Sequence, residues 1–237
     1  MADTATLNLP LLAASQAQKH VTVNEALARI DAALQLSVIS RSLMTPPALP
    51  EAGDCYLVPL GGVNDWDGAD EQLAFYLNGG WEFLTPLAGW KIFVVDEALD
   101  VRFDGVAWQE NPLSSSPFGA GMRAETVEFD FDIGAGASVL TGFVIPKGSV
   151  VLAVTGVVVT AVTGTLSDWS LGVATSDTRY GTLYGVGTGS WLRGVTGQPQ
   201  AYYENTQLKL TANGGDFSGG TVRLAVHLLR FDIPRTS

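Results

Sequence analysis

The chain has 237 residues, of which 46% are hydrophobic and 16% are charged. A composition this apolar supports a folded core and excludes a disordered chain. The 24 acidic and 13 basic side chains give a net charge of −11 at pH 7. Because a nucleic-acid-binding surface needs a basic patch to displace phosphate counterions, this charge argues against a nucleic-acid partner.

The acidic side chains are concentrated in the first half of the chain. Residues 1–115 contain 15 acidic and 5 basic side chains, whereas residues 116–237 contain 9 acidic and 8 basic ones. No run of about 18 apolar residues occurs, so we expect no membrane insertion. The N-terminal residues MADTATLNLPLL lack the basic region and the continuous apolar run of a secretory signal, so none is expected.

Cys55 is the only cysteine, which excludes a disulfide within the chain and a cysteine-based metal site. It precedes Tyr-Leu-Val in an apolar stretch, so we expect it to be buried as a small hydrophobic residue. Four carboxylates in the loop 65–71 suggest a hard cation, but their spacing does not match an EF-hand, and a solvated acidic turn is the preferred interpretation. We expect neither a metal nor a cofactor.

The first predicted element is a helix over about 22–40. Thr22 and Glu25 have the spacing of a capping box, in which the two side chains satisfy each other's backbone donors. An apolar residue then recurs every three or four positions and forms one helical stripe: Val23, Leu27, Ile30, Leu34 and Val38. Three prolines between positions 46 and 50 prevent any continuation.

This stripe is little wider than the seam of a coiled coil. Such a seam buries little apolar surface alone but much against copies of itself. We therefore expect a homotrimer whose axis is lined by Val23, Leu27, Ile30 and Leu34. The alternative is that the stripe packs on the chain's own β structure.

From 51 to 112, short apolar runs separated by Gly, Asp and Asn predict a small antiparallel sheet. The strands are predicted over 55–59, 73–77, 81–84, 90–95 and 101–108. Hairpin turns are predicted at Asn78-Gly79-Gly80 and Asp104-Gly105, which favour positive φ. Residues 113–122 have the Ser, Pro and Gly content of a linker. We therefore expect a first domain over 1–112 and a second over 123–237.

The second half contains short apolar or alternating runs with turns about ten residues apart and no helical period. Strands are predicted over 126–133, 139–145, 150–160, 169–174, 182–186, 200–203, 208–211 and 222–231. Eight such strands predict a β-sandwich of jelly-roll type. The expected fold class is therefore mainly β: an N-terminal helix with a small antiparallel β domain, followed by a jelly-roll-like β-sandwich.

Signals of catalysis are close to absent. The two histidines lie in no nucleophile–base motif, and no P-loop, G-x-S-x-G or H-E-x-x-H motif occurs. Asp168, Asp177 and Glu204 are candidates for the paired carboxylates of a glycosidase, but they are also ordinary loop residues. We expect no enzymatic activity, and a polysaccharide hydrolase is kept as an alternative.

Aromatic residues gather between positions 169 and 203, interleaved with Asp, Arg and Asn. Sugars stack on aromatic faces, while carboxylate and guanidinium groups hydrogen-bond their hydroxyls. A glycan-binding site is therefore predicted from four residues assigned to Gly-rich connections: Trp191, Tyr180, Asp177 and Arg193. Trp169 is predicted to be a core residue, because it shares a strand face with later apolar residues. The alternative is that all of these rings are structural.

The stretch LPLLAASQAQKHVTVNEALARID, from Leu9 to Asp31, resembles the opening signature of a domain-of-unknown-function family found in bacteriophage and gene-transfer-agent structural proteins. The pattern continues to about residue 110 through Pro47, Gly53-Asp54, Tyr56, Gly79-Gly80-Trp81 and Gly89-Trp90. The second half is similar to the C-terminal part of longer members through Trp169–Ala174, Asp177–Gly181, Gly189–Gly194 and Ala201–Tyr203.

The resemblance implies a virion fibre or spike subunit, assembled in the bacterial cytoplasm and located on the surface of a phage-like particle. Its N-terminal part would attach to baseplate, tail or capsid proteins, and its distal β part would contact host envelope polysaccharide. The family has no established catalytic residues, so none is carried over. A tail fibre is the preferred interpretation, and a head spike or head fibre of the same kind of particle is the alternative.

Overall fold

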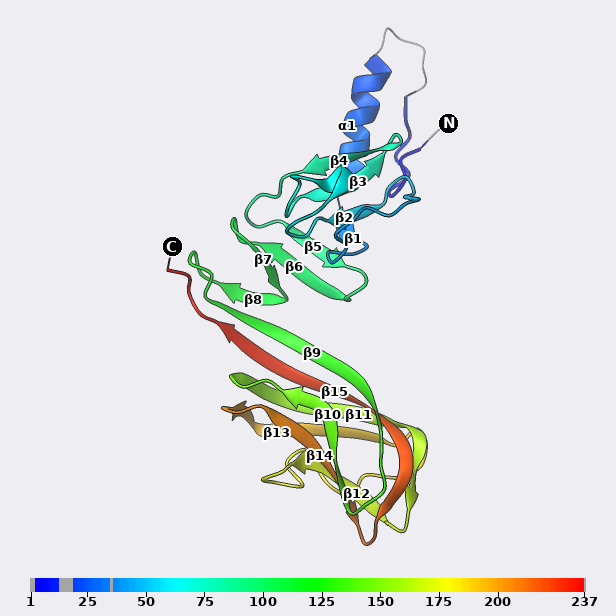
Figure 1. The fold of residues 1–237 in the computed structure, drawn as a ribbon, viewed down its shortest axis with the longest axis vertical. Helices are drawn as coiled ribbons and strands as arrows, with labels where there is room; N and C mark the ends of the chain where they lie inside the picture. The colour runs from blue at the N-terminus through cyan, green and yellow to red at the C-terminus, as the bar shows by residue number, and fades with distance from the viewer. Residues whose placement is uncertain (1–2, 13–18, 35, 237) are drawn as a thin grey trace. The chain divides into compact units, whose positions relative to one another are not determined.

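The structure is a computed structural model that describes residues 3–12, 19–34 and 36–236. It is mainly β, with one N-terminal helix followed by β-sheets, which confirms the predicted fold class (Figure 1). The chain divides into two compact units, unit 1 (Met1–Pro112) and unit 2 (Leu113–Ser237). Each unit has a hydrophobic core of its own.

Unit 1 contains helix α1 (Lys19–Ala33), the short 3-10 helix η1 (Asn64–Trp66) and two small sheets. The four-stranded sheet has the order β1-β5-β6-β7, with β1 (Ser37–Val38), β5 (Lys91–Val94), β6 (Leu99–Phe103) and β7 (Trp108–Glu110). β1 is parallel to β5, and the other pairs are antiparallel. The antiparallel sheet β2-β3-β4 consists of β2 (Cys55–Leu57), β3 (Leu73–Leu77) and β4 (Gly80–Leu84).

The predicted helix over 22–40 is wrong at both ends. Because α1 begins at Lys19, Thr22 lies inside the helix and does not cap it. At the other end α1 stops at Ala33, and Val38 belongs to β1, where it is fully buried beside β5. Val38 and Ile39 are β-branched and fit a pleated surface better than a helix. Strand pairing therefore replaces the last turns of the predicted helix.

The core of unit 1 is made of two small clusters, one between its two sheets and one on the opposite face of the β2-β3-β4 sheet. The larger cluster consists of Val38, Cys55, Leu57, Leu73, Phe75, Ile92, Val94 and Val101. The smaller one consists of Tyr56, Val58, Trp66, Ala69 and Ala74, with Trp81 packed against it. Cys55 is free and buried, as predicted. Burial raises the pKa of its thiol to about 12, so the thiolate is not populated near neutral pH.

Two side chains of α1 hold the N-terminal segment 3–12 against the helix. The buried carboxylate of Asp31 accepts hydrogen bonds from the hydroxyl of Thr4 at 2.7 Å and from the backbone N–H groups of residues 6 and 7 at 2.9 and 2.7 Å. The side chain of Asn24 exchanges two hydrogen bonds with the backbone of Leu12. Asn24 and Asp31 are seven residues apart and share one helix face. The N-terminal segment is therefore bonded to one face of α1.

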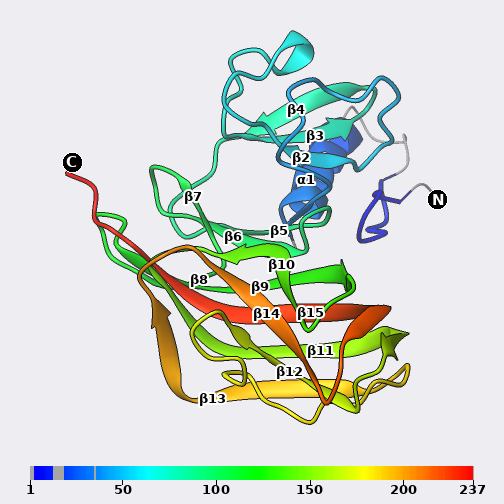
Figure 2. The same ribbon diagram turned by 60° about the horizontal axis from the view of Figure 1, so that its bottom comes forward.

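Unit 2 is built from longer strands: β8 (Pro112–Ser115), β9 (Gly121–Asp132), β10 (Ser138–Ile145), β11 (Ser149–Gly164), β12 (Asp168–Val173), β13 (Trp191–Tyr202), β14 (Thr206–Asn213) and β15 (Phe217–Asp232). They form a five-stranded sheet of order β13-β11-β15-β9-β8 and a three-stranded sheet of order β10-β14-β12. The two sheets face each other across one continuous core (Figure 2).

The connectivity of unit 2 is that of a jelly roll. Every strand from β10 to β15 lies in the opposite sheet from the strand before it, which is the arrangement that two interlocked Greek keys produce. The predicted strand over 182–186 is reduced to one bridge, between Tyr184 and Trp169 at the edge of β12. The predicted jelly-roll type is therefore confirmed, with one irregular edge in the smaller sheet.

The segment 113–122, predicted as a linker, belongs instead to the sheet of unit 2. It contains most of β8, a turn and the start of β9, and β8 pairs with β9 at the sheet edge. The turn is closed by a hydrogen bond from the N–H of Ser116 to the carbonyl of Ala120 at 2.8 Å. Ser, Pro and Gly are residues of turns as well as of linkers, so composition alone does not separate the two.

Candidate functional site

The four residues predicted to bind a glycan do not come together. Trp191 and Arg193 lie on the outer surface of the five-stranded sheet, because Leu192 between them is buried in the core. The side chain of Trp191 is 70% exposed, and the guanidinium carbon of Arg193 lies 5.8 Å from the centre of its ring. Both residues lie at the start of β13 rather than in the Gly-rich loop before it.

The predicted exposure of Tyr180 is wrong. Its side chain is 1% exposed and lies in the core of unit 2, where its hydroxyl is 2.6 Å from that of Tyr202. Burial is the main cause that raises the pKa of Tyr180 above the ordinary tyrosine value. Gly194 on β13 permits this packing, since a Cβ there would overlap the Tyr180 carbonyl oxygen. The ring is structural and cannot stack on a sugar.

Asp177 lies on the opposite side of the sandwich from Trp191. Its carboxylate accepts a hydrogen bond from the ammonium group of Lys209 at 2.9 Å. Lys209 stands on β14 between Leu208 and Leu210, which are both fully buried, so it points away from the core on the smaller sheet. The predicted four-residue site is therefore dispersed over two surfaces and the core.

The prediction that Trp169 is a core residue is confirmed. Trp169 is buried on β12, and its indole N–H donates a hydrogen bond to the carbonyl of Gly185 at 3.1 Å. Its ring centre lies 5.2 Å from that of Tyr184. The ring fills the core while its one polar group finds a partner, as buried tryptophan requires.

A pocket of about 510 Å³ in unit 2 lies where β13 turns into β14. Its lining comes from the turn, the adjoining strand ends and the loop after β12, and its side chains with polar groups include Arg179, Gln200, Tyr203, Glu204, Asn205 and Gln207. These groups can exchange hydrogen bonds with hydroxyls in both directions. We refer to this hollow as the turn pocket.

Hydrogen bonds to neighbouring groups hold several side chains of the turn pocket in place. The guanidinium of Arg179 donates to the side-chain carbonyl of Gln200. The side chain of Asn205 accepts from the backbone N–H of Lys147 at 3.0 Å, and that of Gln207 donates to a backbone carbonyl at 2.7 Å. Tyr203 adds an aromatic ring that is 87% exposed. The turn pocket therefore combines positioned polar groups with an open ring, the composition expected of a sugar site.

Sequence reasoning named Glu204 only as a catalytic candidate and did not select Arg179 or Tyr203 for a binding site, although a usable signal was present. Tyr202 and Tyr203 are adjacent at the end of a strand, and successive side chains of a strand point to opposite faces. One ring of the pair must therefore face outward, and the structure buries Tyr202 and exposes Tyr203. Arg179 is brought beside them by the loop after β12, which the sequence does not reveal.

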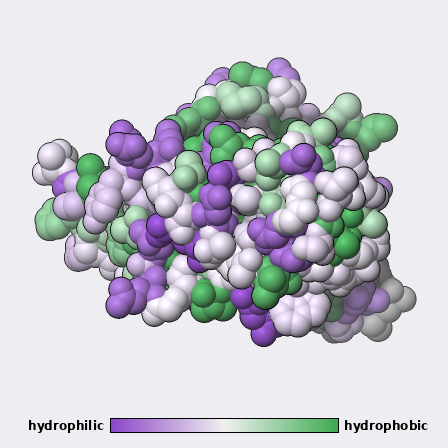
Figure 3. Space-filling model, turned by 90° about the horizontal axis from the view of Figure 1, so that it is seen from below, coloured by the Kyte–Doolittle hydropathy of each residue, from purple (hydrophilic) through white to green (hydrophobic). Residues whose placement is uncertain are grey.

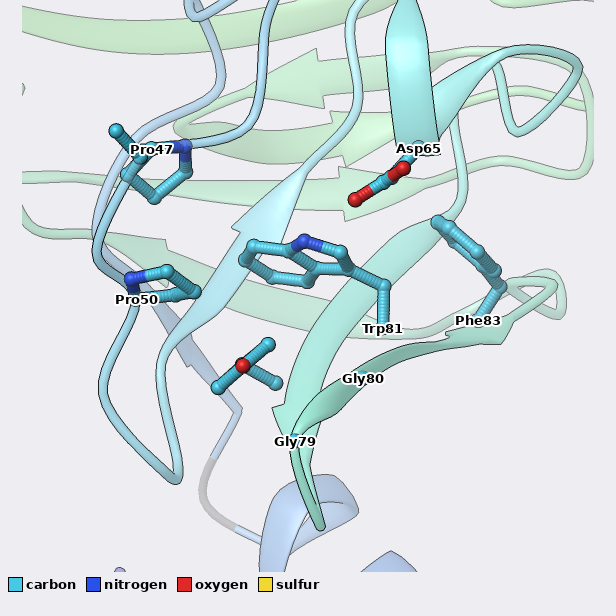
Figure 4. Close-up of a pocket in the computed structure, with 9 residues that line it drawn as sticks. Pro47, Pro50, Asp65, Gly79, Gly80, Trp81 and Phe83 are labelled. Carbon is cyan, nitrogen blue, oxygen red and sulfur yellow. The ribbon is translucent and has the colours of Figure 1, made fainter.

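A second pocket, of about 480 Å³, lies in unit 1 (Figure 4). We refer to it as the aromatic pocket. The rings of Tyr76, Trp81 and Phe83 line it from β3 and β4, and Asp65 from η1 supplies a carboxylate. Its other walls are Pro47, Ala48, Pro50 and the glycines of the β3–β4 turn. Figure 4 places the two labelled prolines on one side of the Trp81 indole and Asp65 and Phe83 on the other.

The acidic loop 65–71 forms a turn rather than a cluster of ligands. Asp70 accepts hydrogen bonds from the backbone N–H groups of Gly61 and Gly62 at 2.9 and 3.2 Å. Among the residues that the structure describes, no three His, Cys, Asp or Glu side chains are close enough to hold a metal ion. Asp70 therefore serves a structural role in this loop.

The apolar stripe predicted for self-association is largely uncovered within the chain. On and just after α1, Val23, Ile30 and Leu34 are 41%, 49% and 54% exposed, while Leu27 is partly buried. Elsewhere, Figure 3 shows a face on which hydrophobic side chains form small groups between hydrophilic ones. Within the described residues, no helix combines the length and the apolar character needed to cross a membrane.

Comparisons with known proteins give few matches. No curated protein matches this chain. Among solved structures, a chain described as "Cyanophage Pam1 capsid asymmetric unit" is similar to this one with 26% sequence identity and a TM-score of 0.35, and the match covers 49% of this chain and 90% of that chain. Residues 23–109, which lie within unit 1, match the model of a family described as "Protein of unknown function (DUF2793)".

Proposed function

We propose that this chain is a structural subunit of a phage-like particle, a tail-fibre subunit that binds host-surface polysaccharide through unit 2. The observation that carries the binding role is the turn pocket, in which an exposed tyrosine stands beside a guanidinium, a carboxylate and three side-chain amides. The assignment to a particle rests on the motif resemblance of residues 9–31 and its continuation through both units.

Unit 1 is proposed to attach the subunit to its particle and to associate with copies of itself. The support is the apolar stripe of Val23, Leu27, Ile30 and Leu34, three of whose members are about half exposed in the single chain. Each Å² of apolar surface removed from water contributes about 25 cal/mol, so three such stripes favour packing around one axis. A homotrimer is the proposed assembly.

The turn pocket gives the polysaccharide proposal a sharp test. The full chain is titrated with purified bacterial capsular polysaccharides and lipopolysaccharide O-chains, and binding is followed by calorimetry. Tyr203→Ala removes the exposed ring and is expected to weaken binding by roughly 5- to 150-fold, by analogy with the loss of one stacking aromatic. Arg179→Lys breaks the planar contact with Gln200 and should weaken binding as well.

Trp191→Ala is the matched control. Trp191 and Tyr202 are the first and last residues of β13. Because a strand rises about 3.3 Å per residue, the two residues are roughly 30 Å or more apart. Removal of Trp191 should leave binding unchanged if the turn pocket is the site. The reverse result would move the site to the Trp191–Arg193 surface, and full binding by both variants would contradict a polysaccharide contact through either ring.

The proposed role is binding without hydrolysis. Of the three carboxylates considered for catalysis, Asp177 is paired with Lys209 and Asp168 accepts hydrogen bonds from Ser167 and Asn213, while Glu204 lines the turn pocket. Incubation with the bound polysaccharide should therefore release no reducing ends. Release that disappears in Glu204→Gln would replace this proposal with a hydrolase.

A further inference from the structure

The aromatic pocket of unit 1 presents three rings on one face of the β2-β3-β4 sheet. Tyr76 stands opposite Trp81 in the register of β3 and β4, and their ring centres are 5.2 Å apart. Phe83 is two residues beyond Trp81 on β4, so its side chain emerges on the same face. The rings thus form one side of the hollow, and the other side is made by the rigid prolines of the loop before β2.

Trp81 is held firmly from behind. Its ring is in edge-on contact with that of Trp66, at 5.3 Å between centres, and with that of Tyr56, at 5.9 Å. Trp66 and Tyr56 are themselves buried in the smaller core cluster of unit 1. The indole therefore presents a fixed surface to the pocket, and a ligand would not have to order it.

Among the described residues, the only charged side chain that lines the aromatic pocket is the carboxylate of Asp65. Figure 4 shows it beside the Trp81 indole, on the side of that ring on which Phe83 also lies. Within the described part of the chain, no side chain forms an ion pair or hydrogen bond with this carboxylate. Residues 1–115, which contain the pocket, have 15 acidic and 5 basic side chains, so the surrounding field also favours a cation.

We propose that the aromatic pocket binds an organic ammonium group whose charge is spread over methyl groups, as in a quaternary amine. The face of an aromatic ring carries partial negative charge and attracts such a cation, and Trp is the strongest of the three ring types. A quaternary ammonium donates no hydrogen bond, so rings, prolines and one carboxylate meet its needs. This site is independent of the turn pocket, which lies in the other unit.

The lining argues against the two other obvious ligands. A saccharide needs several positioned hydrogen-bonding side chains, and among the described residues the lining side chains offer three such groups, the Asp65 carboxylate, the Tyr76 hydroxyl and the Trp81 indole N–H, with no amide or guanidinium group. A divalent metal ion needs several oxygen ligands, whereas one carboxylate lines this space. An ammonium ion without methyl groups would have to leave its hydration shell for a single acceptor. The methylated cation therefore fits the lining best.

The test compares choline with its uncharged carbon analogue, 3,3-dimethylbutan-1-ol, which has nearly the same shape. Both are titrated into the full chain, and the indole N–H signals of the 15N-labelled tryptophans are followed by NMR, with Trp81 assigned from Trp81→Phe. Choline should shift the Trp81 signal and bind roughly 2- to 30-fold more tightly than the neutral analogue. Equal affinities would overturn the proposal, because the charge would then play no part.

Asp65→Asn and its neighbour Asp67→Asn form a matched pair of variants. Both residues are exposed on the same loop, so neither change should disturb folding, but only Asp65 lines the pocket. We expect Asp65→Asn and Phe83→Leu to weaken choline binding and Asp67→Asn to leave it nearly unchanged. Equal weakening by the two Asp variants would mean that only the general acidity of unit 1 attracts the cation. Binding of a neutral oligosaccharide that competes with choline would reassign the site to sugars.

Discussion

Units 1 and 2 are both built around β-sheets, but they bury their apolar residues differently. Apart from the terminal β8, the strands of unit 2 have 6 to 16 residues, and its core is one cluster of 19 buried hydrophobic residues. The strands of unit 1 have 2 to 5 residues, and its core consists of clusters of eight and five. Long strands let two sheets close over one another, whereas short strands leave apolar and aromatic groups at the surface.

This difference matches the proposed division of labour. In unit 1 the uncovered groups are the stripe of α1 and the rings of the aromatic pocket. In unit 2 the jelly roll closes on itself, and its candidate site is confined to a turn between two strands. Surfaces for assembly are thus expected on unit 1, and a small recognition site on a rigid scaffold is expected on unit 2.

The largest expected effect comes from the core of unit 2. Trp169→Ala removes a fully buried ring and should lower the free energy of unfolding by about 3–5 kcal/mol. Trp191→Ala removes a ring that is mostly in water and should change it by less than about 0.5 kcal/mol. Urea unfolding followed by circular dichroism measures both. A large loss from Trp191→Ala would mean that the outer surface of the five-stranded sheet is covered in solution.

The next effect concerns the hydrogen bonds between the N-terminal segment and Asp31 of α1. The carboxylate of Asp31 accepts three hydrogen bonds, whereas the amide in Asp31→Asn places its NH₂ group against N–H or O–H donors. This change should lower the free energy of unfolding by about 1–3 kcal/mol. Thr4→Val, which removes one donor and keeps the carboxylate, should cost less. Hydrogen exchange at the backbone N–H groups of residues 6 and 7 should report the same loosening, and unchanged exchange in Asp31→Asn would contradict this role.

Asp31 also makes the attachment of the N-terminal segment to α1 depend on pH, and the direction of that dependence follows from the pKa of Asp31. Burial raises the pKa of Asp31, but the hydrogen bonds from the segment outweigh burial, and the pKa is lower than its ordinary value. A carboxyl with a lowered folded pKa stabilises the fold above its unfolded pKa of about 4 and loses this contribution as the pH falls through the folded value. The acid-induced loss of stability below about pH 4 should therefore be shallower in Asp31→Asn.

Patterns that depend on neighbours along the chain were predictable, and patterns that depend on distant neighbours were not. Alternation and turn residues identified most strands of unit 2 and the burial of Trp169, because both follow from the period of a strand. The end of α1 was not predictable, since β1 forms only where β5 is present to pair with Val38. The segment 113–122 was likewise read as a linker because its partner strand, β9, is defined by pairing rather than by composition.

The candidate sites failed for the same reason. Trp191 and Arg193 were correctly expected at the surface, but Tyr180 was not recognised as core, because its burial in the loop after β12 depends on Gly194 of β13. The turn pocket joins Arg179 to Tyr203 across a loop, and the aromatic pocket joins Asp65 to Trp81. The two residues of each pair belong to separate elements, and no spacing in the sequence predicts that they lie close together.

A smaller effect is expected at Cys55, and it compares the opening of the two units. Cys55→Ala should cost about 1 kcal/mol, because it removes one buried heavy atom. In the unchanged protein, burial raises the pKa of the thiol, so a disulfide reagent at pH 8 should react only when unit 1 opens. Because the clusters of unit 1 are smaller, labelling should begin at a lower urea concentration than loss of the β signal of unit 2. Coincident transitions would show instead that the two units unfold together.

The smallest effect on the fold, with the largest effect on assembly, is expected from the stripe of α1. Ile30 and Leu34 are about half exposed, so Ile30→Asp with Leu34→Asp should change the stability of the single chain by less than about 0.5 kcal/mol. The same pair should abolish the proposed trimer, since each axis position would carry three carboxylates.

Val21→Asp is the matched control, because Val21 is equally exposed on α1 but lies roughly 200° from Val23 around the helix. Light scattering at micromolar concentration should give a trimer for the unchanged protein and for Val21→Asp, and a monomer for the double variant. A monomeric unchanged protein would refute the trimer, and dissociation by Val21→Asp as well would attribute the effect to added charge rather than to the stripe.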